Sequence, residues 1–106
     1  VTIKVHFLQP YPVTVNTPEE TELVLAVMKQ AMGGEGQVVP DMPPSMASED
    51  FGFMLEQRPG ALVMLGNGNS APLHAPDYDF DDTIIPHGIA YWVALAHACL
   101  RPNQDI

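Results

Sequence analysis

The chain has 106 residues, 46% of them hydrophobic, which is enough for one domain with a core and too little for two. Lys and Arg total 4 and Asp and Glu total 13, so the formal net charge is −9. Nucleic-acid phosphates and anionic lipid headgroups both require cationic surface, so this charge argues against nucleic acid and membrane surfaces as partners.

The chain has a single cysteine, Cys99, so no internal disulfide can form. It contains no signal-like segment and no uninterrupted apolar run of about 20 residues, the length of a membrane span. These features predict a cytoplasmic protein without a transmembrane segment. Val1 lies in the middle of a strand-like pattern and no methionine starts the chain, so we expect a piece of a longer protein.

The first third of the chain changes from a strand pattern to a helix pattern. Residues 1–8 alternate apolar and polar side chains, which predicts a half-buried strand, and residues 11–16 continue in an extended form. Residues 17–20 (TPEE) form a capping box with proline at the first helical position, so a helix is predicted to begin there. The double glycine at residues 33–34 is its stop signal.

The middle of the chain contains shorter elements. Residues 37–40 could form a short strand, and residues 48–50 (SED) open a second helix from Phe51 to about Gln57. Residues 61–65 are a continuous apolar run, which suits a strand buried on both faces.

The last part of the chain predicts a flexible loop and a long helix. Residues 66–70 (GNGNS) form the loop, and the helix begins at Thr83 or Pro86 and runs to Leu100. This helix is apolar nearly all round, so it should be covered on most sides. Strand and helix patterns therefore alternate along the chain, which predicts an α/β fold with parallel strands.

The most informative segment is LHAPDYDFDD at residues 73–82, in which carboxylates follow His74 closely. An imidazole beside concentrated negative charge is typical of a divalent-metal site, although a single loop histidine is more often bonded to backbone. Here a buried strand and a glycine loop precede it. His74 is therefore expected beyond the carboxyl end of a strand, where ligands bind in open α/β sheets. Pro76 stiffens the backbone beside it.

The carboxylates themselves, Asp77, Asp79, Asp81 and Asp82, are spaced like those of a calcium loop. That interpretation fails, because the sixth position of such a loop would be Asp82 instead of glycine and the twelfth Gly88 instead of glutamate. Asp81 or Asp82 is expected to cap the last helix. Asp79 could orient a metal ligand or accept a buried hydrogen bond.

A second polar group, Ser48, Glu49 and Asp50, precedes the second helix. The plain interpretation is a serine cap followed by acids that suit the helix dipole. The functional interpretation places this terminus in the same cleft as His74, where it could bond substrate or orient a metal ligand. A zinc site needs about three or four protein ligands, so we do not expect a complete metal centre from this chain alone.

The remaining histidines and the cysteine are weaker candidates. His6 lies on the polar face of the first strand, His87 lies at a helix start, and His97 lies within an apolar helix. Cys99 has no adjacent base or cation, which makes a nucleophilic role improbable.

Several blocks of the sequence together resemble one family: Met46-Ala47-Ser48-Glu49-Asp50-Phe51, Pro59-Gly60-Ala61, Leu65-Gly66, Leu73-His74-Ala75-Pro76 and Tyr78-Asp79-Phe80-Asp81-Asp82. The chain resembles the C-terminal third of the metal-dependent amidohydrolases that include hippurate hydrolase, N-acyl-amino-acid aminoacylases and auxin-conjugate hydrolases. They belong to the zinc aminopeptidase/carboxypeptidase superfamily. One departure is Ala75, where the family usually has Ser or Asn.

The resemblance implies a fold. Residues 1–10 would be the last strand of an inserted ferredoxin-like α+β lid domain, which often dimerises. Residues 11–106 would be the C-terminal part of the zinc-aminopeptidase-like catalytic domain. Because a piece of such a domain should expose apolar sheet and helix faces, we expect a homo-oligomer or contact with the missing N-terminal part of the same protein.

The resemblance also implies a chemistry. The parent protein would bind two divalent ions (Zn, Mn, Co or Ni) and hydrolyse the amide bond of N-acyl amino acids. His74 matches the family's last metal ligand, and Ser48, Glu49, Asp50 and Asp79 would lie at the cleft or behind the ligands. The other ligands and the general base would come from an N-terminal part that this chain lacks, so the chain alone is expected to be inactive.

A second hypothesis comes from the strand pattern alone. Residues 1–8 could be an exposed strand edge that recruits a partner, in a non-catalytic interaction module. The acidic loop would then be only solvated surface.

Overall fold

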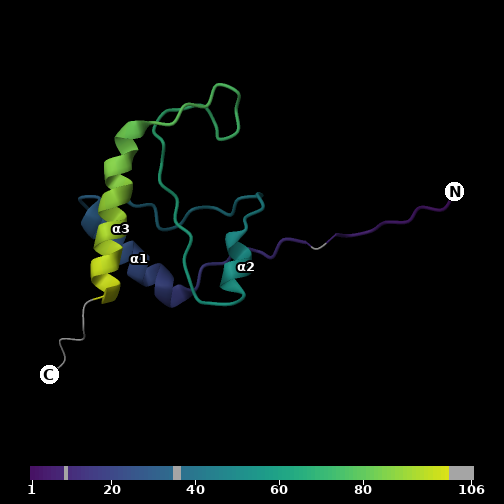
Figure 1. Ribbon diagram of the computed structural model, residues 1–106, viewed down its shortest axis with the longest axis horizontal. Helices are drawn as coiled ribbons and strands as arrows, with labels where there is room; N and C mark the ends of the chain where they lie inside the picture. The colour runs from purple at the N-terminus through teal and green to yellow at the C-terminus, as the bar shows by residue number, and fades with distance from the viewer. Residues whose placement is uncertain (9, 35–36, 101–106) are drawn as a thin grey trace.

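The computed structural model describes residues 1–8, 10–34 and 37–100. Its helices follow in the order α1 (Pro18–Ala31), α2 (Phe51–Leu55), the 3-10 helix η2 (Asp82–Ile84) and α3 (Ile85–Leu100). Figure 1 shows α1 beside α3, α2 apart from both, and the first residues projecting from the body as an arm. The molecule is elongated, with extents of 71 × 41 × 20 Å along its principal axes.

Helix α1 begins and ends where the sequence predicts. Thr17 precedes it in an extended conformation, Pro18 follows, and Gly33 comes just after its end with φ 82°, in the left-handed region that glycine favours. The predicted capping box is only partly confirmed. The Thr17 hydroxyl bonds to the Glu20 carboxylate but makes no cap bond to the helix backbone. The hydroxyl has a second partner, Gly60, on a distant segment.

The small core lies between α1 and α3. Val24 and Val27 of α1 and Tyr91 of α3 are its buried hydrophobic side chains. Helix α3 begins at Ile85, within the predicted range, and η2 leads directly into it. The packing of α1 against α3 is therefore the main contact between helices in the described residues.

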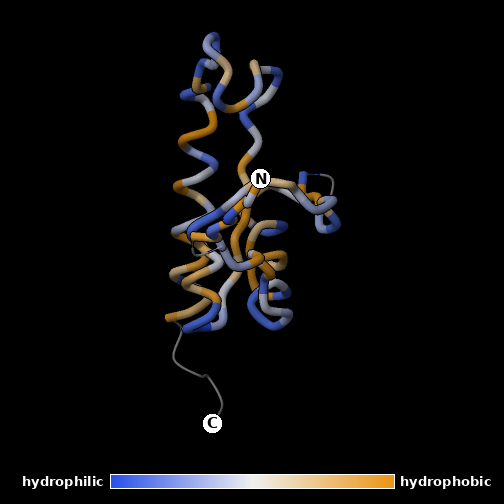
Figure 2. The backbone as a smooth tube through the Cα atoms, turned by 90° about the vertical axis from the view of Figure 1, so that its right-hand side faces the viewer, coloured by the Kyte–Doolittle hydropathy of each residue, from blue (hydrophilic) through white to orange (hydrophobic). Residues whose placement is uncertain are grey.

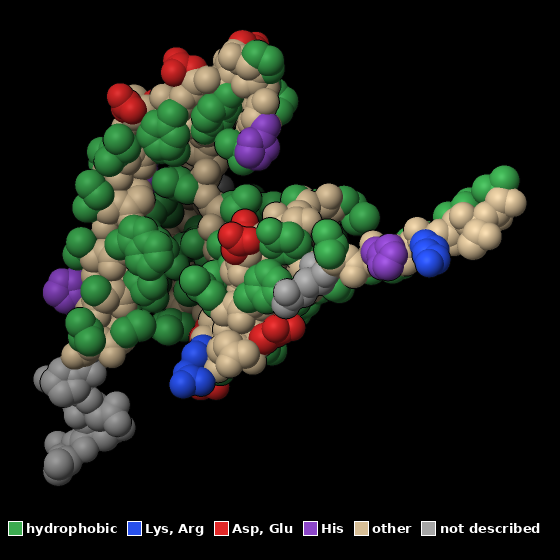
Figure 3. Space-filling model, turned by 45° about the vertical axis from the view of Figure 1, so that its right-hand side comes forward, with side chains coloured by type: hydrophobic (Ala, Val, Ile, Leu, Met, Phe, Trp, Pro, Cys, Tyr) green, Lys and Arg blue, Asp and Glu red, His purple; other side chains and the backbone are tan. Residues whose placement is uncertain are grey.

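The prediction that α3 is covered on most sides is not confirmed within the described residues. Ile89 is 58% exposed and Trp92 64% exposed. Helix α1 packs against one side of α3 (Figure 1), and Figure 3 shows hydrophobic side chains along the outer surface of this part of the molecule. By length and composition, the segment Asp82–Leu100 would also pass for a membrane span, with a hydropathy of 1.3. Apolar core helices of globular domains pass the same test, so these properties alone do not place α3 in a membrane.

Helix α2 is shorter than predicted and packs against the chain that enters α1. It ends at Leu55, short of Gln57, and its Gly52 is buried. A Cβ atom on Gly52 would lie 2.9 Å from the Pro12 carbonyl oxygen and 3.2 Å from the Thr14 hydroxyl. The glycine is therefore required by this close approach of two backbones.

Two side chains join the start of α1 to the segment at residues 60–62. The Asn16 carboxamide donates to the Leu62 carbonyl and accepts from the Leu62 N–H, both at 2.8 Å. The Thr17 N–H donates to the Gly60 carbonyl at 3.0 Å, and the Thr17 hydroxyl accepts from the Gly60 N–H at 2.9 Å. Four backbone groups of an otherwise irregular segment are satisfied in this way.

The strands predicted at residues 1–8, 37–40 and 61–65 are not confirmed, because the structure assigns no strand to any described residue. A strand needs backbone partners on a neighbouring strand. Residues 1–8 are all exposed in the projecting arm (Figure 1), and Leu62, in the third segment, pairs with a side chain instead. The α/β layering therefore remains a prediction. Residue 9 and residues 101–106, which fall in the two predicted domains, lie outside the described residues.

Candidate functional site

His74 lies at the turn of a long loop that precedes η2 and α3. It is exposed, and its φ of 71° places it in the left-handed region, where non-glycine residues are uncommon. The turn around it is closed by the Ala75 N–H, which donates to the Pro72 carbonyl at 3.0 Å. A second turn follows at once, with Pro76 at its second position and the Tyr78 N–H donating to the Ala75 carbonyl at 3.0 Å. Two consecutive turns thus present His74 to solvent.

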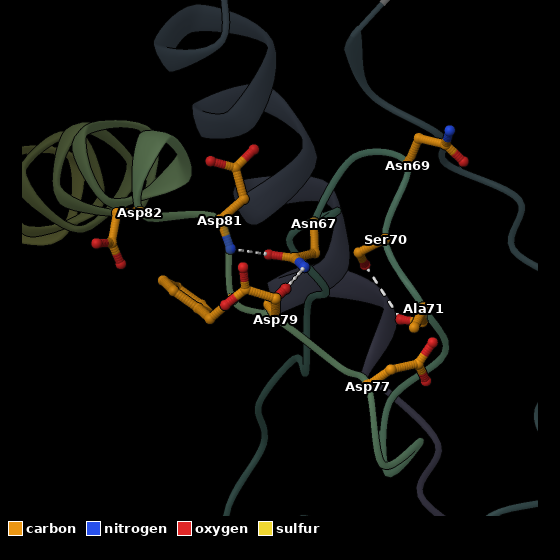
Figure 4. Close-up of a pocket in the computed structure, with 9 residues that line it drawn as sticks. Asn67, Asn69, Ser70, Ala71, Asp77, Asp79, Asp81 and Asp82 are labelled. Carbon is orange, nitrogen blue, oxygen red and sulfur yellow. Dashed lines mark hydrogen bonds between the residues drawn. The ribbon is translucent and has the colours of Figure 1, made fainter.

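The loop is closed at its base by Asn67. The Asn67 amide nitrogen donates to the Asp79 carbonyl oxygen, and the Asp81 N–H donates to the Asn67 amide oxygen, both at 2.9 Å (Figure 4). We call residues 67–81 the His74 loop. Residues 66–70 were predicted to be flexible, but Asn67 is instead a fixed point of this loop. The sequence offers no signal for this role beyond the amide itself, because the partner atoms lie on the backbone more than ten residues away.

Beside this closure lies a shallow depression of about 460 Å³. Its polar wall comes from both sides of the loop and includes Ser70, Asp77 and Asp79. Figure 4 shows the Asp77 carboxylate on the far side of the depression from Asp82. The acids therefore surround the depression without gathering at a point.

Asp81, and not Asp82, is the helix cap. Its carboxylate accepts from the Thr83 N–H at 2.9 Å and from the Thr83 hydroxyl at 2.6 Å, and it precedes η2 in an extended conformation. The hydroxyl bond first, and then the backbone bond, lower the pKa of Asp81 below its ordinary 3.8. The prediction that Asp81 or Asp82 caps the last helix is confirmed, and Asp81 is the residue that does so.

Residues 48–50 lie at the start of α2, as predicted, but the N-cap position is occupied by Asp50 and not by Ser48. Asp50 occupies the N-cap position without a side-chain cap bond, and the Glu49 carboxylate accepts from the Phe51 N–H at 3.2 Å. Ser48 is not the cap. All three side chains, Ser48, Glu49 and Asp50, are exposed.

The predicted site residues do not converge within the described part of the chain. No group of three or more His, Cys, Asp or Glu side chains there could hold a metal ion. Figures 1 and 2 show the His74 loop beyond the first turn of α3, at the top of both views, whereas α2 lies lower in Figure 1. His74, Asp79 and residues 48–50 are thus separate surface features in this structure.

The weaker candidates also lie where no site forms. His6 is exposed in the arm, and Cys99 is exposed on α3. His97 lines a second shallow depression, of about 530 Å³, where Gln30 of α1 faces α3.

Comparison with known proteins decides the family. The model of peptidase family M20/M25/M40 matches residues 1–98. The chain belongs to this family. Hippurate hydrolase of Campylobacter jejuni is 34% identical over 101 residues, which are 95% of this chain and 26% of that protein. No solved structure matches the chain.

Two further relatives show the range of M20/M25/M40 proteins that the chain resembles. Thermostable carboxypeptidase 2 of Saccharolobus solfataricus is 31% identical, over 93% of this chain and 24% of its own length. IAA-amino acid hydrolase ILR1-like 2 of Arabidopsis thaliana is 30% identical, over 92% of this chain and 23% of its own length. The chain thus spans about a quarter of the length of these relatives.

The M20/M25/M40 assignment confirms the resemblance found in the sequence. Enzymes of this family generally depend on two metal ions. The helices and loops described above are therefore part of an M20/M25/M40 protein, and His74 lies within the matched residues.

Proposed function

We propose that this chain forms one wall of the active site of a metal-dependent amidohydrolase, to which His74 contributes a metal ligand. The observation that carries the proposal is the state of His74 within an M20/M25/M40 sequence. Its imidazole is exposed, two turns fix its backbone, and no side-chain hydrogen bond ties it to the rest of the described chain. The ordinary interpretation, a loop histidine bonded to backbone, is therefore disfavoured.

The described residues do not by themselves form a complete metal site. A catalytic zinc site takes three protein ligands and a two-metal site takes more, whereas these residues bring no three candidate ligands together. We therefore propose that residues outside this chain supply the other ligands and the general base. When bound, divalent ions in such a centre polarise an amide carbonyl and activate water.

The polar residues beside α2 are proposed to border the substrate. Ser48 and Asp50 make no bond to the helix backbone through their side chains, so their polar groups remain available. Glu49 is partly engaged by the Phe51 N–H. Asp79 uses its backbone carbonyl for the loop closure, which leaves its carboxylate on the depression.

The substrate class follows from the names of two relatives. One is a hippurate hydrolase and one an IAA-amino acid hydrolase, and both names describe an acyl group joined to an amino acid through an amide. We propose an N-acyl amino acid as the substrate, with the metal being Zn, Mn, Co or Ni.

The proposed fold explains the exposed apolar surface. Residues 11–16 alternate exposed and half-buried positions, with Val13 82% and Val15 66% exposed. This pattern fits a strand whose outer face is covered by protein beyond this chain. We propose that residues 11–16 and 61–65 join a larger α/β sheet, and that residues 1–10 belong to an inserted lid domain.

The test is hydrolysis of N-benzoylglycine by the intact protein that carries this chain. We expect turnover that a chelator abolishes and that added zinc, manganese, cobalt or nickel restores. N-acyl amino acids should be better substrates than free dipeptides. Turnover that persists after complete metal removal would contradict the proposal.

A second candidate, a non-catalytic interaction module, is favoured by the arm. Its apolar side chains Ile3, Val5 and Phe7 are 81%, 69% and 89% exposed, and the segment projects from the body (Figure 1). An extended segment of this kind can add to the edge of a partner's sheet. Calorimetric titration with zinc separates the two candidates, because only the first predicts binding that depends on His74.

A further inference from the structure

The side chain of Asn67 uses both ends of its carboxamide to close the His74 loop. The amide nitrogen donates to the Asp79 carbonyl and the amide oxygen accepts from the Asp81 N–H, each at 2.9 Å. The two bonds span 12 and 14 residues along the chain. We call Asn67 and residues 79–81, where the two ends of the His74 loop meet, the neck of the loop. One half-buried side chain therefore holds the two sides of this neck together (Figure 4).

The neck is itself anchored to the start of α3 from both sides. On the incoming side, the Leu65 side chain lies beside Gly88 of α3, where it would be 3.6 Å from a Cβ atom added to this glycine. On the outgoing side, Asp81 caps η2 through its two bonds from Thr83. The Asn67 bonds at the neck therefore hold the loop in place relative to α3, in addition to joining its two ends.

Beyond the neck, the bonds of the loop are local. Two turns, closed at Ala75 and Tyr78, set the backbone around His74, and Ser70 bonds to its neighbour Ala71. These local turns fix the backbone conformation around His74, which we call the tip of the loop, but they do not fix the direction in which the tip points. Among the described hydrogen bonds, those of Asn67 are the ones that connect the tip's two sides across more than ten residues.

We propose that Asn67 is the positioning residue for His74, acting by closing the neck of the His74 loop so that the imidazole is held in one direction. The inference rests on the proposed function, in which His74 is a metal ligand. A carboxamide can donate to one backbone group and accept from another at the same time. Aspartate keeps the acceptor but turns an oxygen toward the Asp79 carbonyl, and alanine removes both bonds.

The test uses Asn67→Ala and Asn67→Asp in the intact protein, with Asn69→Ala as the matched control. Asn69 is an exposed amide of the same loop, and Figure 4 shows it pointing away from Asn67. The first readout is hydrogen–deuterium exchange of residues 68–80 in metal-free protein. We expect faster exchange in both Asn67 variants and unchanged exchange in the control. Unchanged exchange in both Asn67 variants would overturn the proposal.

The second readout is the zinc affinity measured by calorimetry in a cycle with His74→Ala. Changes to residues that orient a metal ligand typically lower metal affinity by about 10- to 100-fold, so we expect a loss of about tenfold from Asn67→Ala. This loss should vanish when His74 is already alanine. An equal loss in both backgrounds would overturn the positioning role, since Asn67 would then act on the fold and not through His74.

The two proposals fail in different ways. If His74→Ala leaves zinc affinity unchanged, the proposed function fails, while the exchange experiment still decides whether Asn67 closes the loop. If His74→Ala weakens zinc binding but Asn67→Ala and Asn67→Asp do not, the function stands and the positioning role is wrong. Asn67→Asp retains the shape of the side chain and one of its bonds, so it provides the answer if Asn67→Ala does not fold.

Discussion

The His74 loop and the arm at residues 1–8 are both exposed and both lack regular secondary structure, yet they are held very differently. The loop has hydrogen bonds of its own, from two backbone turns and from Asn67. The arm projects from the body, and its apolar side chains are exposed. A segment that satisfies its own backbone keeps a shape alone, whereas a strand-like segment needs a partner to acquire one.

The largest expected effect distinguishes the histidine of the loop, His74, from the histidine of the arm, His6. His74→Ala should lower metal-dependent amide hydrolysis by the intact protein by about 100-fold or more, because losing a ligand costs at least as much as losing a residue that orients one. The matched control is His6→Ala, which removes the exposed histidine of the arm. Steady-state kinetics at saturating metal measures both. Equal activity in the two variants would contradict the distinction between loop and arm.

The second prediction concerns the arm. The 106-residue chain should self-associate through its exposed apolar surface. Ile3→Lys should weaken this association by about 10- to 100-fold, because burying one such side chain is worth about 1.5 to 3 kcal/mol. Thr2→Lys adds the same charge on the opposite face of the arm and should have little effect. Sedimentation equilibrium at several concentrations gives the association constants, and a monomer at every concentration would contradict the prediction.

The third prediction concerns the contact between α2 and the segment that follows the arm. Gly52→Ala places a Cβ atom 2.9 Å from the Pro12 carbonyl oxygen, so α2 must shift. We expect a loss of about 1 to 3 kcal/mol in the free energy of unfolding, typical of overpacking. Gly66→Ala is the control, because nothing lies within 4 Å of its Cβ position. Urea unfolding of the intact protein compares the two, and equal stability would show that this contact is not tight.

The smallest effect is a pH dependence at the neck of the loop. The pKa of Asp81 is lowered in the folded protein, so its cap is fully formed above the ordinary value of 3.8 and is lost as the pH falls through the lowered value. The Thr83 amide proton should therefore exchange faster, relative to its intrinsic rate, as the pH falls below 3.8 and through the lowered pKa of Asp81.

The control for this effect is Asp81→Asn. Asparagine caps helices about as well as aspartate but does not titrate in this range, so the pH dependence should disappear. NMR of the Thr83 amide checks it. A dependence that survives in Asp81→Asn would assign the titration to another group.

The helices could be predicted because their signals are local. Pro18 and the double glycine after α1 mark its ends within a few residues, and the apolar run of α3 has a clear start and length. The strands at residues 1–8 and 61–65 have equally clear patterns but are not confirmed. A helix satisfies its backbone within itself, and a strand depends on a neighbour that the pattern does not specify.

The candidate site was predictable to a similar extent. The sequence singled out His74 and narrowed the helix cap to two aspartates, both from short-range spacing. It missed the roles of Asn16 and Asn67, because their carboxamides bond to backbone 46 and up to 14 residues away. Contacts of that kind carry no periodic signal, so only the folded chain reveals them.

The central claim is that His74, and no other histidine of this chain, binds a metal ion. The chain has 4 histidines, at positions 6, 74, 87 and 97, so each imidazole can be assigned by NMR of histidine-labelled protein through single substitutions. On addition of zinc to the metal-free intact protein, the ring nitrogens of His74 should move to the shifts of a coordinated imidazole, while those of His6, His87 and His97 stay in place. An unchanged His74 signal in zinc-saturated protein would contradict the account.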